Sequence, residues 1–419
     1  MYSDSSHDLL SRPFLPPVTF SFAANYRKTK QAFRRQDTRG LPLHITQAFD
    51  AGNIEIVSAS NASDIQLRIR QDAQSDFYQW FYFRLTGAGG TPCTLKLLNA
   101  AGAAYPAGFE DYRVVYSYDR KHWRRHSTEL IDGVLHIPIT PEQDSIYFAY
   151  FTPYSMERHA DLIATSLRSP LCRLEVLGQS LDGQDIDLLK ITGPGDSSHR
   201  KNCWLIARQH PGESMAQWWM EGALESLLDP TSEFSAELLQ RCNFYVIANM
   251  NPDGSRRGHL RTNAAGRNLN REWETPTMEN SPEVYLTREA MTHFGVDFFL
   301  DVHGDESLPY CFIAGVEGLA DWNADKQAQL DFYKNRLAQR NADFQTEVGY
   351  PPKAPGEANL SMSTGFVGSH FGCLAMTLEM PFKDTTATPD PEFGWSGDRS
   401  KKLAHSCLVV IAEYFESGL

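Results

Sequence analysis

Apolar and polar residues alternate with a period of two between about residues 50 and 150, which is typical of half-buried β-strands. Turn-forming clusters, such as residues 87–90, separate the runs. The expected strands are 53–57, 65–70, 80–85, 94–98, 114–118 and 134–139. Short strands without intervening helices predict an all-β sandwich domain. Its aromatic residues are interpreted as core packing, with a sugar or peptide platform as the alternative: Tyr78, Trp80, Phe81, Tyr82, Tyr116 and Trp123.

The pattern changes after about residue 153, where apolar runs alternate with stretches of helical period. This alternation is typical of an α/β domain. The expected strands are 173–177, 187–191, 203–207, 244–248, 298–302, 309–313 and 374–378. The expected helices are 214–228, 281–293, 323–342 and 399–416, and Ser155 is the expected N-cap of another helix, which runs to Ile163. We therefore divide the chain into an N-terminal extension (1–48), a β-sandwich domain (49–152) and an α/β domain (153–419).

The N-terminal extension carries a basic run at residues 26–35, inside an acidic chain. Pro13, Pro16 and Pro17 prevent a helix before it. We interpret the run as a solvated extension or a short packed helix, with a nucleic-acid patch as the alternative.

Composition limits the classes of partner. The chain has 419 residues, enough for two domains, and 42% of them are hydrophobic. Its formal net charge is -13, which argues against nucleic acid as the main partner, since phosphate binding requires a basic face. The same charge disfavours simple attraction to an acidic substrate.

The cysteines and the apolar runs bear on location. Seven cysteines are scattered without C-x-x-C spacing, which argues against a disulfide framework and indicates a reducing compartment. The first residues do not resemble a signal peptide, and no apolar run approaches the ~18 residues of a membrane span. We expect a soluble cytoplasmic protein with no membrane partner. Export by a non-classical route and the oligomeric state stay open.

The segment 208–214 contains the first candidate metal ligands along the chain. His210 and Glu213 are three residues apart, directly after the apolar run 203–207 and before an amphipathic stretch. The pair therefore lies at the carboxyl end of an expected strand, where open α/β sheets bind ligands. An imidazole and a carboxylate from one turn can hold a zinc ion. Taken alone, this spacing is also compatible with an ordinary surface turn.

Further motifs follow in order. Asn251-Pro-Asp-Gly254 comes after the run 244–248, and Arg261 and the segment 266–273 come next. His303 and Glu379 then end two more apolar runs. Chance alone poorly explains why several expected strands end in residues that can bind a metal or transfer protons.

This ordered set resembles the zinc metallocarboxypeptidases, and in particular the cytosolic carboxypeptidase-like subfamily. Residues 177–183 belong to the same resemblance, and residues 76–83 resemble the β-domain that precedes the catalytic domain in that subfamily. The resemblance implies an α/β domain with a mixed sheet and helices on both faces. It also implies one Zn²⁺ per chain and peptide or protein C-termini as partners.

The resemblance also implies roles for individual residues. His210, Glu213 and His303 would hold the zinc, and Glu379 would be the general base. Arg261 would polarise the scissile carbonyl. Asn270 and Arg271 match the pair that binds the terminal carboxylate. The family's tyrosine over the terminal residue has no clear counterpart in this sequence, and Tyr350 is our candidate for it.

Neighbouring residues have less specific interpretations. Asp301 would orient a ligand histidine or merely cap its strand. Asn251 and Gly254 would form a turn. Three further arginines are expected to be surface or loop supports: Arg256, Arg257 and Arg267.

The sequence departs from the subfamily in two places. Gly304-Asp305-Glu306 stands where Gly-His-Ser is common. The stretch 361–368 lacks the arginine that deglutamylating members carry, with Lys353 or Arg288 as possible substitutes. Both departures disfavour an acidic terminal side chain. The expected function is a zinc-dependent metallocarboxypeptidase. The alternatives are an amidase or deacylase on the same zinc site, or a non-catalytic module that binds C-termini.

Overall fold

The computed structural model describes residues 42–419, which form one compact unit. The basic run 26–35 lies outside the described residues, so its interpretation stays a prediction. The domain limits also stay predictions. The first strand, β1 (His44–Thr46), lies before residue 49 and already pairs with β4 (Tyr82–Thr86) of the β-rich domain. Among residues 42–419, no helix combines the length and the hydropathy that crossing a bilayer requires.

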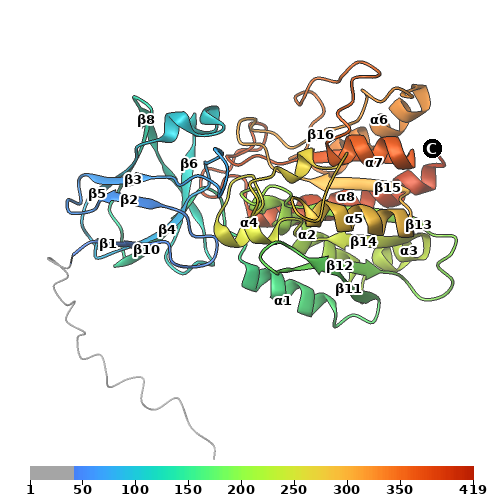
Figure 1. Cartoon of the computed structure of the whole chain (residues 1–419), viewed down its shortest axis with the longest axis horizontal. Coiled ribbons are helices and arrows are strands. Elements are labelled where there is room, and N and C mark those ends of the chain that lie inside the picture. The colour runs from blue at the N-terminus through green and yellow to red at the C-terminus, as the bar shows by residue number, and fades with distance from the viewer. Residues whose placement is uncertain (1–41) are drawn as a thin grey trace, which may run out of the picture. The chain divides into compact units, whose positions relative to one another are not determined.

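The β-rich domain consists of two five-stranded sheets (Figure 1). The first has the order β1, β4, β10 (Ser145–Ala149), β6 (Arg113–Ser117) and β7 (Arg124–Ser127). The second has the order β2 (Glu55–Ser58), β3 (Ile65–Arg68), β5 (Cys93–Leu97), β9 (Val134–Ile139) and β8 (Glu129–Ile131). Two short 3₁₀ helices, η1 (Ala100–Gly102) and η2 (Pro106–Phe109), follow β5.

Alternation along these strands builds the core. In β5, Cys93, Leu95 and Leu97 are buried, whereas Thr94 and Lys96 between them are partly exposed. The interpretation of the aromatic residues as packing is confirmed, since Trp80, Phe81 and Tyr82 are buried in the core. The pattern did not reveal β7 and β8, because β7 is Arg-Arg-His-Ser and all three residues of β8 are exposed.

The α/β domain contains a seven-stranded mixed sheet. Its order is β11 (Cys172–Gln179), β12 (Asp185–Ile191), β14 (Cys242–Ile247), β13 (Lys201–Ala207), β15 (Phe298–Val302), β17 (Leu374–Glu379) and β16 (Phe312–Ala314). The four central strands β14, β13, β15 and β17 are parallel, and the outer strands are antiparallel to their neighbours. Parallel strands end at the same edge of a sheet, and this places the candidate motifs together.

Helices cover both faces of this sheet, as expected. In β13, Cys203 and Leu205 join the core beneath α2 and α8, whereas Trp204 and Ile206 join the core beneath α5 and α7. Successive side chains of this one strand therefore point to opposite faces of the sheet and contribute to both cores. The helices are α1 (Met156–Ser166), α2 (Ser214–Leu227), α3 (Glu233–Arg241), α4 (Pro252–Arg257), α5 (Pro282–Phe294), α6 (Ala324–Arg340), α7 (Ser363–Phe371) and α8 (Gly397–Ser417), with the 3₁₀ helix η3 (Leu269–Arg271).

Local capping confirms one prediction and corrects another. Ser155 is the N-cap of α1, and its side chain accepts a hydrogen bond from the backbone N–H of Arg158 at 3.1 Å. The turn expected at Asn251 and Gly254 is wrong. Asn251 is instead the N-cap of the short helix α4, and its side chain accepts from the backbone N–H of Gly254 inside that helix. The stretch 361–368, whose structure was not predicted, leads into α7.

Candidate zinc site

The carboxyl ends of β13, β15 and β17 lie side by side, with Ala207 opposite Val302 and Val302 opposite Leu378. The segments that follow β13 and β15 carry His210 and His303, and Glu379 ends β17. Sheet register therefore brings together residues that lie far apart in the sequence.

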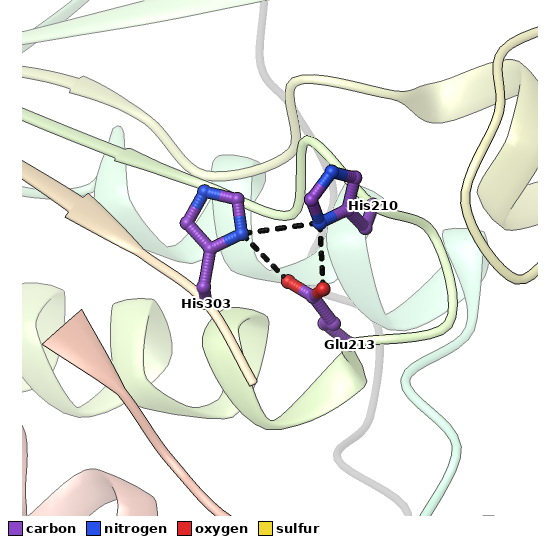
Figure 2. A group of neighbouring side chains, drawn as sticks. All are labelled: His210, Glu213 and His303. Carbon is purple, nitrogen blue, oxygen red and sulfur yellow. Dashed lines mark hydrogen bonds and ion pairs between the residues drawn. The ribbon is translucent and has the colours of Figure 1, made fainter. Parts of the chain in front are cut away.

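His210, Glu213 and His303 converge at this edge (Figure 2). Nδ1 of His210 lies 2.6 Å from Oε1 of Glu213, and Nδ1 of His303 lies 2.8 Å from Oε2. The two Nδ1 atoms are 3.2 Å apart. All three side chains are buried. Two imidazoles and one carboxylate are a donor set of catalytic zinc sites, and tetrahedral zinc places its ligand atoms about 3.3 Å apart. The residues therefore fit a zinc ion.

The outer nitrogens of both rings have partners. Nε2 of His303 lies 2.8 Å from Oδ2 of Asp301, and Nε2 of His210 lies 3.0 Å from Oδ1 of Asn268. An acceptor at Nε2 places the proton there and leaves the Nδ1 lone pair for a metal. Asn268 was not singled out from the sequence, although it stands within the recognised segment 266–273.

The surroundings shift the pKa values of His210 and Glu213 toward the protonation states that bind a metal. Desolvation, helped by the Arg261 charge, lowers the pKa of His210 to about 4, which favours the neutral form that binds metal. Burial alone would raise the pKa of Glu213, but the two imidazoles hold it below its ordinary value.

The turn that presents His210 and Glu213 depends on Arg208. Its φ of 59° is in the left-handed region, which non-glycine residues adopt infrequently. Its guanidinium is buried and donates to the carbonyl oxygens of Pro211 and Tyr154, both at 2.9 Å. Arg208 therefore stabilises the chain reversal between β13 and α2. This role could not be predicted from the sequence, because a buried arginine that bonds backbone oxygens has no distinctive spacing.

Glu379 is buried beside the three residues, with 6% of its surface exposed. Burial raises its pKa well above the ordinary value, and nearby carboxylates, Glu213 first, add to this effect. Within residues 42–419, its Oε2 has no hydrogen-bond partner. Its Oε1 accepts from the Tyr350 hydroxyl at 3.3 Å, and the same hydroxyl donates to Asp305 at 2.6 Å. A carboxylate with an unused oxygen and a raised pKa is suited to proton transfer.

A cavity of about 880 Å³ opens on this cluster. It is also lined by Arg261, Asn270, Arg271 and Tyr350, so every candidate residue reaches one cavity. Arg257 and Arg267 do not line it. They pair with Asp182 at 2.7 Å and with Glu272 at 2.8 Å, which agrees with their interpretation as supports.

Both departures from the subfamily lie in this cavity. Asp305 and Glu306 line it, and burial raises the pKa of Glu306 well above its ordinary value. The lining residues from the stretch 361–368 are Met362, Thr364 and Gly365, which carry no charge. Of the two suggested substitutes, Arg288 bonds the Trp273 carbonyl instead of lining the cavity, whereas Lys353 does line it. Lys334, on α6, is a further cation of the lining that the sequence did not reveal.

Two family models match the chain. Residues 157–390 match the zinc carboxypeptidase model, and residues 45–151 match the cytosolic carboxypeptidase N-terminal domain. The chain belongs to the zinc carboxypeptidase family, whose members use a zinc ion. Within that family it combines the catalytic domain with the N-terminal domain of the cytosolic carboxypeptidases.

Individual relatives agree with this assignment. An uncharacterised protein of Zymomonas mobilis is 49% identical over 376 residues, which cover 90% of this chain and 97% of that one. Human cytosolic carboxypeptidase 2 is 29% identical over 64% of this chain, which spans only 33% of that longer protein. The structure of a metallo-carboxypeptidase from Pseudomonas aeruginosa, in complex with (2-guanidinoethylmercapto)succinic acid, superposes with a TM-score of 0.87. It is 43% identical, and the alignment covers 89% of this chain and 99% of that chain.

Proposed function

We propose that this protein is a zinc-dependent metallocarboxypeptidase that removes the C-terminal residue of peptides or proteins. One observation carries the proposal. The His210–Glu213–His303 cluster shares one cavity with Arg261, Arg271 and Glu379, whose Oε2 has no hydrogen-bond partner among residues 42–419. Family membership supports the same activity.

Zinc held by His210, Glu213 and His303 would polarise a bound carbonyl and make a water more acidic. Glu379 takes the proton of the attacking water at its free Oε2 and passes it to the leaving amine. Its raised pKa suits it to hold that proton between the two transfers.

Recognition of a free C-terminus falls to the cationic side of the cavity. Arg271 presents a planar fork that can bind both oxygens of a carboxylate. Asn270 lies beside it, and the Asn270 carbonyl accepts from Arg271 Nη1 at 2.6 Å. Arg261 stabilises the negative charge that develops on the scissile carbonyl. Tyr350, which bonds to both Asp305 and Glu379, closes over the terminal residue.

The Pseudomonas aeruginosa relative supports a site of this character. The compound in its structure carries a succinate and a guanidinium group. In this chain, arginines for a carboxylate and the acidic pair Asp305 and Glu306 for a cation line the same cavity. We propose peptide or protein C-termini as partners, with nucleic acid and membranes excluded, and a cytoplasmic location. The seven cysteines, all unpaired, are compatible with a reducing compartment.

The test uses zinc-loaded protein and a pool of peptides of mixed sequence, with C-terminal losses read by mass spectrometry. Stepwise loss of single C-terminal residues is expected, and His303→Ala should abolish it together with the bound zinc. Release of acyl groups instead would indicate an amidase or deacylase. Binding of peptides without any cleavage would indicate a module that only recognises C-termini.

A further inference from the structure

The segment that carries Arg261 is held by the β-rich domain. Asp72, which follows β3, is 2% exposed. One of its carboxylate oxygens accepts from the backbone N–H of Leu260 at 2.6 Å, and the other accepts from those of Arg261 and Thr262 at 2.8 and 2.9 Å. The Thr262 hydroxyl donates to the same carboxylate at 3.0 Å. A single carboxylate thus sets the backbone on both sides of Arg261.

The guanidinium of Arg261 also rests on the β-rich domain. Its Cζ lies 5.6 Å from the ring centre of Phe77 and 5.4 Å from that of Tyr105, distances at which aromatic rings attract a cation. In the described part of the chain, no carboxylate forms an ion pair with Arg261, and its buried Nε has no hydrogen-bond partner. Aromatic contacts hold the cation without neutralising it, so its donors stay available to a developing negative charge.

Two glycines allow this close contact. Gly258 and Gly266 flank the segment, and each has a φ of 73°, in the left-handed region. A Cβ at Gly258 would lie 2.6 Å from the Ala51 carbonyl oxygen, and one at Gly266 would lie 2.3 Å from that of Gln74. The backbone of the segment therefore lies against the β-rich domain at both ends.

We propose that Asp72, Phe77 and Tyr105 are positioning residues that aim Arg261 at the scissile carbonyl, so that the β-rich domain forms part of the catalytic machinery. The proposal rests on the proposed function. It assigns to the β-rich domain a part in transition-state stabilisation that acts through Arg261: Asp72 orients the backbone, and the two rings orient the side chain.

Asp72→Asn is the principal variant. An amide offers one acceptor oxygen in place of two and turns an N–H₂ group toward backbone donors. Charge stabilisation of this kind acts mainly in the transition state, so kcat should fall about 10- to 100-fold while KM stays within about threefold. Tyr105→Ala should lower kcat in the same way, whereas Tyr105→Phe, which keeps the ring, should retain most of it.

Asp50→Asn is the matched control. Asp50 also belongs to the β-rich domain and also accepts from a backbone N–H of the α/β domain, that of Met156 at 2.8 Å, but no residue of α1, which Met156 begins, lines the cavity. This variant should keep the wild-type kcat. Zinc content and melting temperature should be measured for every variant, so that general loss of structure is recognised.

A double-mutant cycle separates positioning from a structural effect. If Asp72 acts through Arg261, then adding Asp72→Asn to Arg261→Ala should cost less than about threefold in kcat, because the guanidinium is already absent. The proposal would be overturned if Asp72→Asn lowered kcat as much in the Arg261→Ala variant as in the wild type. It would also be overturned if Asp72→Asn alone kept the wild-type kcat.

A binding measurement distinguishes failure of this proposal from failure of the proposed function. The probe is a phosphinic peptide analogue, whose tetrahedral anion resembles the developing charge, titrated into zinc-loaded protein by calorimetry. Asp72→Asn should weaken its binding about 10-fold or more, and Asp50→Asn should not. A wild type that binds the probe with this pattern but cleaves no peptide would overturn the proposed function alone. Equal binding by wild type and Asp72→Asn would overturn the positioning role, whereas no binding by either would overturn the proposed function and, with it, the positioning role that rests on it.

Discussion

Oδ2 of Asp301 lies 2.8 Å from Nε2 of His303, on the side of the ring opposite to Glu213. The same oxygen accepts from the side chains of Gln209 and Ser363. The Ser363 backbone N–H in turn donates to Asn270 Oδ1 at 2.9 Å. One buried carboxylate therefore connects a candidate metal ligand with a candidate substrate-binding residue.

Asp301→Asn should weaken zinc binding about 10- to 100-fold, because acceptors behind a ligand histidine orient its ring and raise its basicity. Competition with a chelator of known affinity measures the change. Unaltered affinity would mean that Asp301 only completes its strand, the alternative that the sequence left open.

Glu379→Gln should keep the zinc and lose about 100- to 10,000-fold in turnover, because the amide has a similar shape but cannot take a proton. Metal analysis tests whether the zinc is retained, and steady-state kinetics on one peptide test the loss of turnover. Near-normal rates would exclude Glu379 as the general base.

Activity should require a free terminal carboxylate, since Arg271 and Asn270 are the donors that would bind it. A peptide with a C-terminal amide should be cleaved far more slowly than its free acid, and Arg271→Ala should narrow the difference between the two. Equal rates for both peptides in the wild type would indicate an endopeptidase or an amidase.

Peptides that end in glutamate should not be preferred. Asp305 and Glu306 line the cavity, and the lining residues from the stretch 361–368 are uncharged. An unpaired buried carboxylate costs several kcal/mol, and about 1.4 kcal/mol already corresponds to a tenfold change. The comparison uses matched peptides that end in Glu, Lys, Leu or Phe. A tenfold higher kcat/KM for the Glu peptide would contradict the expectation, and Lys334 and Lys353 would then be the cations to replace.

Stability should depend on pH through Glu283, in the first turn of α5. Burial raises the pKa of this carboxyl to about 8. The folded state then binds more protons than the unfolded state between about pH 4.5 and 8, so this group makes the free energy of unfolding fall as pH rises through that window. Glu283→Gln should flatten this part of the dependence in urea unfolding at pH 5.5, 7 and 8.5. The exposed neighbour Glu279 provides the control, because Glu279→Gln should keep the wild-type slope.

The periodicity of the sequence predicted most of the fold, because long strands such as β13 and β9 bury alternate or successive apolar residues. It missed α3 and α7, of nine residues each, because neither offers enough turns for a clear helical period. The metal cluster could be found because each member follows an apolar run. The roles of Arg208, Asn268 and Asp72 could not be found from the sequence. Each acts by bonding to the backbone or to another side chain, and such partners are known only once the chain has folded.

The contact between Asp72 and the Arg261 segment also has a consequence for the order of biosynthesis. The β-rich domain leaves the ribosome first, and domains generally fold as units during synthesis. If the β-rich domain folds in this way, the acceptor for Leu260, Arg261 and Thr262 is in place when that segment emerges, more than 180 residues later. In a nascent chain that pauses before residue 258, the Asp72 carboxylate of the folded β-rich domain should therefore be exposed to water. The backbone N–H groups of residues 260–262 would bind it once translation resumes.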